Sequence, residues 1–411
     1  MARKLKIAID CRISDPCQGI GTAVLALAKA LSESRTTSQE YTFIVRESMM
    51  DWLRPYISGP CQLKGVPASR FSVVKRALKW CAPLRLLWKR YGGIASHVPV
   101  SDGYVESQQF DVVHFPTQIA YLTELPTIYQ PHDLQHLHYP QFFPKVEFAR
   151  REKQYRAFCD RAAYVVVHAE WTKQDVINHY EIAPERIVVI PWGSVFDAYN
   201  SPSPEETRAT IAKYELPSHF FFYPAVTWPH KNHEVIFRAL NILKKEHAIT
   251  PHVFFTGSST DHRPTLDKLA RDLGVSEQLH FLGFVTPTEL QVIFRVATAM
   301  IYSSRFEGFG LPILEAFHAG LPVLSSNAST LPEVARDGAV YFDPDSPREL
   351  SALVKAILDT PELRENLIKN GMMILPKYSI NKVAANFQTL YERTAALHSQ
   401  DPQELQVPTT M

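Results

Sequence analysis

The chain has 411 residues, of which 45% are hydrophobic and 21% charged, and its formal net charge is +1. This length is typical of two globular domains that each bury their own core. The near-neutral charge argues against a nucleic-acid binder that relies on bulk positive charge, and we expect no nucleic-acid partner.

The five cysteines are odd in number and form no C-x-x-C pair. They predict reduced thiols rather than a disulfide framework or a zinc site. The amino terminus, MARKLKIAIDCRI, passes from a basic tip directly into a strand, without the apolar run of a signal peptide. No uncharged apolar run is long enough to span a bilayer, so we expect a cytoplasmic protein.

Predicted strands and helices alternate from the start of the chain. Leu5 to Asp10 has the composition of a strand, and Ala23 to Leu31 has helical periodicity. Between them, Gln18-Gly19-Ile20-Gly21 predicts a tight loop before a helix, the shape of a phosphate cradle. Val24 stands where a dinucleotide fingerprint has its third glycine, which argues against a dehydrogenase. An ordinary glycine turn remains the alternative.

Residues 71–94 interleave basic with apolar and aromatic side chains, after a further predicted strand at Tyr41 to Val45. Basic amphipathic segments of this kind can lie on anionic membrane surfaces. The alternative is a core-facing helix whose basic side is solvated. Peripheral contact with the inner face of the membrane through 71–94 is therefore one of two open interpretations.

A histidine-rich segment follows the predicted strands Asp111 to Phe115 and Pro126 to Gln130. It contains His132, Asp133, His136 and His138. His132 and His136 would share a face if the segment were helical, which raises the option of a metal site. No further matching ligand run appears, so we expect no metal.

The first half ends with predicted elements at 163–169, 171–179 and 187–191, a pattern typical of a doubly wound α/β domain. Asn200 to Glu206, NSPSPEE, predicts an interdomain hinge. We expect an amino-terminal domain at 1–200, a second domain at 207–378, and a carboxyl-terminal helix at 379–400 that returns to the first domain.

The second half opens with a strand at Phe220 to Tyr223, a polar turn and a helix from Glu234. Lys231 lies in that turn, where a strand gives way to a helix N-terminus, and this position suits a bound phosphate. A surface lysine without a ligand is the alternative. Further on, Thr286 is predicted to cap the helix 287–295, and Asp343 and Asp345 to cap a later helix rather than to bind metal.

The stretch 301–344 predicts a strand, a glycine-rich turn, a helix from Leu311 that ends near Gly320, and a second strand. Such a βαβ unit places ligands at the carboxyl ends of its strands. Glu307 and Glu315 stand on either side of Gly308, Phe309 and Gly310. Glycine amides and a helix N-terminus suit a diphosphate, and the two carboxylates suit sugar hydroxyls. Taken alone, the E-x7-E spacing is equally compatible with two solvated glutamates.

The run EGFGLPILEAFHAGLPVLSSNASTLPEV resembles, almost position for position, the donor site of the retaining glycosyltransferase family 4. The resemblance covers most of the chain and is weakest between Gln39 and Gly103. It implies an α/β protein of GT-B fold, with two doubly wound Rossmann-like domains facing across a cleft. The substrate would be a nucleotide diphosphate sugar, without a cofactor or metal.

The resemblance also implies roles for individual residues. His132, Lys231 and Glu307 would be catalytic, and His132 and Asp133 would bind the acceptor. Lys231 would bind the diphosphate, Glu307 the donor sugar and Glu315 the ribose. The implied donor-binding residues are Gly19, Gly21, Lys231, Val285, Glu307, Gly308, Phe309, Gly310, Leu311 and Glu315.

One departure from the family pattern lies just before Lys231. Relatives carry a Gly-Arg pair after the strand, whereas this chain has Ala225, Val226 and Thr227. His230 or Arg305 would have to supply the second cation. The WPHKN stretch resembles mannosyltransferase-type members that use a guanine nucleotide.

The resemblance therefore implies transfer of a hexose, with GDP-mannose as the expected donor, to a glycan or lipid-linked acceptor in polysaccharide or glycoconjugate biosynthesis. Two alternatives stay open. One is a GT-B epimerase or phosphorylase, and the other is a catalytically silent subunit that binds nucleotide sugars as a scaffold.

Overall fold

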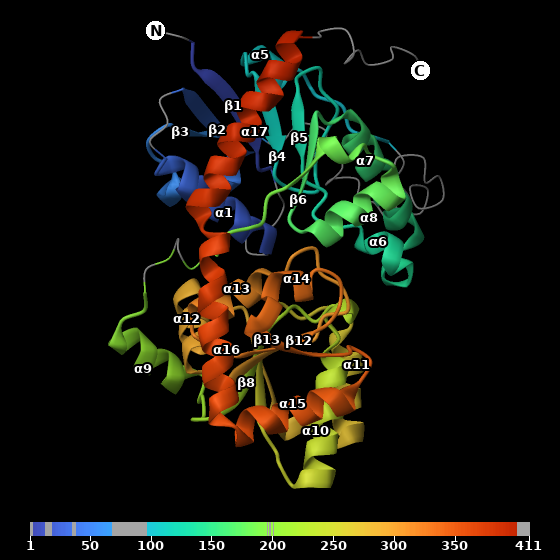
Figure 1. Ribbon diagram of the computed structural model, residues 1–411, viewed down its shortest axis with the longest axis vertical. Helices are drawn as coiled ribbons and strands as arrows, with labels where there is room; N and C mark the ends of the chain where they lie inside the picture. The colour runs from blue at the N-terminus through green and yellow to red at the C-terminus, as the bar shows by residue number, and fades with distance from the viewer. Residues whose placement is uncertain are drawn as a thin grey trace, which may run out of the picture. The chain divides into compact units, whose positions relative to one another are not determined.

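The computed structural model describes residues 3–12, 19–34, 38–67, 97–194, 196, 199 and 201–400, and the side chains of these through residue 397. Two compact units divide the chain (Figure 1). Unit 1 combines Met1–Pro191 with the carboxyl-terminal segment that starts at Ile380, and unit 2 is Trp192–Ser379. The basic segment 71–94 and Gln18 lie outside the described residues.

Unit 1 is built on a parallel sheet of seven strands in the order β3-β2-β1-β4-β5-β6-β7. The strands are β1 (Leu5–Asp10), β2 (Gln39–Arg46), β3 (Cys61–Val66), β4 (Val112–Phe115), β5 (Thr127–Tyr129), β6 (Tyr164–Val167) and β7 (Ile187–Val189). Strands β4, β5 and β6 are buried at every position. Such apolar strands are typical of a parallel sheet covered on both faces.

Among the described residues of unit 1, the α-helices are α1 (Gly19–Ser32), α2 (Met50–Leu53), α5 (Tyr104–Ser107), α6 (Gln135–His138), α7 (Lys145–Arg161), α8 (Glu170–Tyr180) and α17 (Ile380–Gln400). Helix α17 packs against α1, β1 and β4. Its Tyr391 hydroxyl lies 2.8 Å from Nδ1 of His114 in β4. The Gln39 side chain of β2 also donates to the carbonyl of Gln388.

Unit 2 has a parallel six-stranded sheet in the order β10-β9-β8-β11-β12-β13. Its strands are β8 (Phe220–Pro224), β9 (His252–Thr256), β10 (Leu279–Gly283), β11 (Ala299–Tyr302), β12 (Val323–Ser326) and β13 (Ala339–Phe342). Its α-helices are α9 (Pro204–Lys213), α10 (His233–His247), α11 (Arg263–Leu273), α12 (Pro287–Val296), α13 (Leu311–His318), α14 (Leu331–Ala335), α15 (Pro347–Asp359) and α16 (Pro361–Ile374).

Short 3-10 helices supplement both units. They are Glu47–Met49, Arg54–Tyr56, Pro140–Phe142, Pro184–Arg186, Pro229–Lys231, Ser276–Gln278, Arg336–Gly338 and Leu375–Tyr378. In both sheets the strand order reverses beside the first strand of the unit, between β1 and β4 and between β8 and β11. Open α/β sheets bind ligands at the carboxyl ends of the strands at such a switch point. The topology alone therefore predicts that ligands bind at the loops after β1, β4, β8 and β11.

Three local expectations from the sequence are wrong. Gly19 and Gly21 belong to the first turn of α1 and not to a loop before it. The expected hinge overlaps α9, because Ser203 and Glu206 form a capping box that starts this helix at Pro204. The cap of α15 is Ser346, whose side chain accepts from the Glu349 amide, rather than an aspartate.

The expected cap of α12 is confirmed, since the Thr286 side chain accepts from the Glu289 amide in a capping box. Cys11, Cys61 and Cys159 are buried free thiols, as the cysteine pattern predicted. Within the described ranges, no helix combines the length and apolar character needed to cross a bilayer.

Candidate active site

Lys231 lies at the carboxyl end of β8, at the switch point of unit 2. A 3-10 turn (Pro229–Lys231) leads from β8 into α10, and Asn232 adopts a left-handed conformation with φ 55° between them. The Lys231 carbonyl accepts hydrogen bonds from the Tyr223 hydroxyl at 2.9 Å and from the Ser303 hydroxyl at 3.0 Å. These bonds fix the lysine backbone between β8 and β11.

Glu307 lies in the loop that follows β11, on the other side of the same switch point. Its amide donates to the Ser329 hydroxyl at 2.9 Å, and its carbonyl accepts from Ser329 and Thr330 at 3.0 Å each. The amide of Arg305 donates to the His230 carbonyl at 2.8 Å, which ties this loop to the Lys231 turn. Hydrogen bonds therefore connect two loops that are far apart in the sequence.

The two predicted catalytic side chains of unit 2 are in direct contact. Lys231 Nζ lies 2.5 Å from Glu307 Oε1, and the two side chains are only 18% and 14% exposed. Burial favours a higher pKa for Glu307, but the Lys231 ammonium outweighs it and holds the pKa below its usual value of 4.5. The Glu307 carboxyl group is therefore ionised at neutral pH. The Lys231 ammonium group can meet an anion, while the Glu307 carboxylate can accept sugar hydroxyls.

His230 cannot supply the second cation that the family resemblance implies. Burial, reinforced by the charge of Lys231, lowers the pKa of His230 to about 3, so this imidazole is neutral at pH 7. Arg305 forms an ion pair with Asp345. Its amide bonds to the His230 carbonyl, which places Arg305 beside the Lys231 turn.

The glycine turn Gly308 to Gly310 leads directly into α13. Gly310 has φ 103°, and a Cβ there would lie 2.8 Å from a Leu331 methyl carbon, so only glycine fits. The Thr330 hydroxyl lies within 3.2 Å of the Phe309 carbonyl, and the Phe309 ring packs edge-on against Tyr378. These contacts hold the glycine turn in place. Helix α13 starts at Leu311, and the dipole at its N-terminus favours an anion.

Glu315 lies on α13 one turn beyond the start of the helix and is 7% exposed. Burial raises its pKa to about 7. Burial is the cause of this shift, because it disfavours the ionised form of the carboxyl group. A buried carboxyl group with a raised pKa is costly to the fold when it ionises and is typical of a functional site.

We expect Glu315→Gln to stabilise the protein in a pH-dependent manner. The folded-state pKa of about 7 lies above the ordinary 4.5, so the wild-type protein loses stability as the pH rises through this interval. The gain in the free energy of unfolding should be about 2 kcal/mol larger at pH 8 than at pH 5. Urea denaturation of both proteins at the two pH values measures it. A gain that does not depend on pH would show that Glu315 carries no raised pKa.

Val285 lies in the loop between β10 and α12, at the carboxyl edge of the same sheet. It is 8% exposed and precedes the capping residue Thr286, whereas its neighbour Phe284 is 64% exposed. The structure thus brings the loops of Lys231, Val285 and Glu307 to one edge of the unit 2 sheet. The predicted donor residues of unit 2 lie at this edge or in α13.

His132 lies at the carboxyl end of β5 in unit 1, with a left-handed φ of 66°. Its Nε2 lies 3.1 Å from the Pro116 carbonyl, so Nε2 carries the proton and Nδ1 is an acceptor. Its ring packs against His168, with 5.2 Å between centroids. Burial lowers the pKa of His132 to about 4, so the side chain is a neutral hydrogen-bonding group at pH 7.

The remaining residues of the histidine-rich segment separate in space. Asp133 lies two residues before α6, and its carboxylate accepts a hydrogen bond from the Gln135 amide at 3.0 Å. His136 is fully buried beside Glu152 and Tyr180. His138 instead contacts Asp175 of α8. Because His132 is not helical, the shared helical face of His132 and His136 that the sequence offered does not exist.

The structure adds a polar cluster that the sequence did not reveal. Asp10 and Arg12, at the carboxyl end of β1, form a bidentate ion pair with a closest distance of 2.7 Å. The Tyr121 hydroxyl donates to Asp10 at 2.9 Å. Gly19 and Gly21 begin α1, the next described element. In the sequence, this cluster is marked only by two polar residues, Asp10 and Arg12, at the end of a buried strand. That strand lies at the switch point of the sheet.

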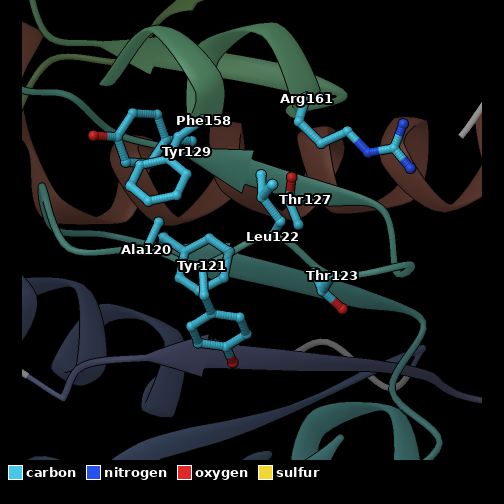
Figure 2. A pocket seen from close by; sticks show the side chains of 9 residues that line it. Ala120, Tyr121, Leu122, Thr123, Thr127, Tyr129, Phe158 and Arg161 are labelled. Carbon is cyan, nitrogen blue, oxygen red and sulfur yellow. The ribbon is translucent and has the colours of Figure 1, made fainter. Parts of the chain in front are cut away.

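Tyr121 also lines a small recess in unit 1 (Figure 2). Its lining residues are Phe115, Ala120, Tyr121, Leu122, Thr123, Thr127, Tyr129, Phe158 and Arg161. The Tyr129 and Phe158 rings cover one side of it, and Tyr121 covers the opposite side. It includes none of the residues that the sequence predicts for donor or acceptor binding, so we do not assign it to the active site.

Two family models match the chain. The model described as "Glycosyl transferases group 1" matches residues 203–372, and that described as "Glycosyltransferase Family 4" matches residues 18–194. O-antigen chain mannosyltransferase B of Escherichia coli is 27% identical over 249 residues, which cover 60% of this chain and 65% of that protein. O-antigen chain mannosyltransferase RfbU of Salmonella typhimurium is 28% identical over 232 residues, which cover 56% of this chain and 60% of that protein. These matches span less than two thirds of either relative.

Solved structures resemble the whole chain. Alr3699/HepE of Anabaena in complex with UDP and glucose matches with a TM-score of 0.70 and 16% identity, over 95% of this chain and all of that one. The sucrose-phosphate synthase of Thermosynechococcus elongatus matches with a TM-score of 0.68 and 17% identity, over 96% of this chain and 100% of that one. At this identity they show the fold, which is GT-B. The two family models between them match most of the chain, and with them the chain belongs to glycosyltransferase family 4.

Proposed function

We propose that this protein transfers a hexose from a nucleotide diphosphate sugar to a hydroxyl of a glycan or lipid-linked acceptor, with retention at the anomeric carbon. The observation that carries the proposal is the contact between Lys231 and Glu307 at the switch point of the unit 2 sheet, beside the start of α13. A diphosphate sugar offers an anion for the first group and hydroxyls for the second.

The proposed roles follow from the position of each group. Lys231 and the amides at Gly308, Phe309 and Gly310 stabilise the diphosphate, Glu307 holds the hexose and Glu315 the ribose. Val285 lies against the nucleobase and Leu311 begins the helix. In unit 1, His132 and Asp133 bind the acceptor.

The chemistry needs no pair of glycosidase-type carboxylates. The leaving diphosphate can take the proton of the attacking hydroxyl on the same face of the sugar, and the enzyme contributes positioning and charge stabilisation. We propose that no divalent ion takes part in this step. Adding Mg²⁺ or Mn²⁺ should therefore leave the transfer rate unchanged.

We propose mannose from GDP-mannose as the donor, since the first relatives are named mannosyltransferases. A panel of nucleotide sugars tested by thermal shift should show the largest rise in melting temperature with GDP-mannose. A larger rise with a uridine nucleotide sugar would contradict the choice of donor and leave the reaction class intact.

A transfer assay with the preferred donor separates a transferase from an epimerase, a phosphorylase and a scaffold subunit. A transferase forms product only when an acceptor glycan or lipid is present, and its product keeps the donor's anomeric configuration. Product from the donor alone would indicate an epimerase, and product that depends on inorganic phosphate would indicate a phosphorylase. Donor binding without turnover, with every acceptor of an O-antigen type, would favour the scaffold subunit.

A further inference from the structure

We propose that His138, Asp175 and His179 of unit 1 form a zinc site that links α6 to α8. His138 is the last residue of α6, while Asp175 and His179 lie one turn apart on one face of α8. One ligand atom from each side chain lies within 4.8 Å of the other two. The site is separate from the residues proposed for glycosyl transfer.

The closest atoms already have nearly the spacing of metal ligands. His138 Nε2 lies 2.8 Å from Asp175 Oδ1, and His179 Nδ1 lies 3.1 Å from the same oxygen. A tetrahedral zinc ion at about 2.0–2.1 Å from each ligand separates neighbouring ligand atoms by about 3.3 Å. Shifts of a few tenths of an ångström therefore suffice to admit the ion.

The burial of Asp175 is an independent observation that points to a cation. Its side chain is 6% exposed, and its Oδ2 is buried with no hydrogen-bond partner among the described residues. An unsatisfied buried carboxylate oxygen is unfavourable, and a cation coordinated by both oxygens of Asp175 would remove this penalty. His138 and His179 are 29% and 39% exposed, so an ion can reach the carboxylate between them.

The surroundings hold the two imidazoles in place. The His138 ring packs against Trp171 at 5.6 Å and against His179 at 5.4 Å between centroids. His179 Nδ1 lies 3.0 Å from the Asp175 carbonyl, a bond that it exchanges for the metal when its proton moves to Nε2. Arg156, which donates to the His179 carbonyl, is paired with Glu152, so it does not place an unpaired positive charge at the site.

The donor set favours zinc over the common hard cations. Two imidazole nitrogens and one carboxylate group suit zinc, whereas Mg²⁺ and Ca²⁺ require oxygen ligands. Helix α6 follows the His132–Asp133 segment and α8 follows β6, so the ion would fix the segment proposed to bind the acceptor. It would act on the structure of unit 1 and not on the transferred sugar.

Calorimetric titration of the tag-free full chain with ZnCl2, after dialysis against a chelator, tests the proposal. We expect one equivalent of Zn²⁺ to bind and to raise the melting temperature, with no such effect of Mg²⁺ or Ca²⁺. His179→Ala, at an exposed position, should lower the zinc affinity at least about tenfold, and Asp175→Asn should do the same. His247→Ala, an exposed histidine of unit 2, is the matched control and should bind as the wild type does.

Substitution with Co²⁺ gives a second readout, the visible spectrum of a four-coordinate nitrogen and oxygen site. The spectrum should vanish in His138→Ala and His179→Ala, both of which alter the protein surface and should fold. Absence of saturable one-to-one zinc binding would overturn the proposal. Unchanged zinc affinity in both surface variants would also overturn it, even if Asp175→Asn failed to fold.

Discussion

Replacing Lys231 with alanine is expected to lower the rate of glycosyl transfer by about a hundredfold or more, equivalent to about 3 kcal/mol of transition-state stabilisation. The ammonium group is the cation in direct contact with Glu307, and neighbouring His230 is neutral at pH 7. Its removal deprives the leaving diphosphate of that charge and leaves the Glu307 carboxylate uncompensated beside it. Both effects act against the departure of an anion.

The matched control is Lys245→Ala, an exposed lysine on α10 in the same unit. Both variants are assayed for transfer and for donor hydrolysis after their melting temperatures have been compared. Lys245→Ala should keep the wild-type rate. Wild-type turnover in a folded Lys231→Ala protein would remove Lys231 from the active site.

Glu307→Gln is expected to reduce transfer by a similar factor, about a hundredfold or more. Glutamine preserves the shape of the side chain but loses the negative charge. It accepts sugar hydroxyls less strongly and no longer stabilises the positive charge that develops at the anomeric carbon. Since the Ser329 and Thr330 bonds go to the Glu307 backbone, the loop should keep its conformation. Glu362→Gln, an exposed glutamate of the same unit, is the control.

The double variant Lys231→Ala with Glu307→Gln tests whether the two groups act as one unit. Residues in direct contact show non-additive effects. We therefore expect the double variant to lose much less activity than the product of the two single losses. Strict additivity would mean that the 2.5 Å contact has no bearing on transfer.

The sequence predicted most elements of the fold because its strands are short, apolar and buried on both faces. Leu5 to Asp10 matches β1 at both ends, and Thr286 caps α12 as expected. Residue spacing alone left Glu307 ambiguous between a ligand-binding and a solvated glutamate. Only the strand order, which places β8 beside β11, explains why Lys231 and Glu307 meet despite their distance along the chain.

Other features could not be predicted because they depend on tertiary contacts. The raised pKa of Glu315 results from burial within unit 2, and the low pKa of His230 from burial beside Lys231. The histidine-rich segment was considered as one site, but the left-handed His132 turns the chain and sends His138 toward α8. The partners Asp175 and His179 lie on a later helix, outside the local pattern.

The central claim is that a nucleotide diphosphate sugar binds with its diphosphate at Lys231 and its sugar at Glu307. A crystal structure of the protein soaked with GDP-mannose tests it most directly. We predict phosphate oxygens at about 3 Å from Lys231 Nζ and sugar hydroxyls at a similar distance from the Glu307 carboxylate. A nucleotide sugar bound away from the carboxyl ends of β8 and β11, or a Lys231 side chain turned away from the phosphates, would contradict the account.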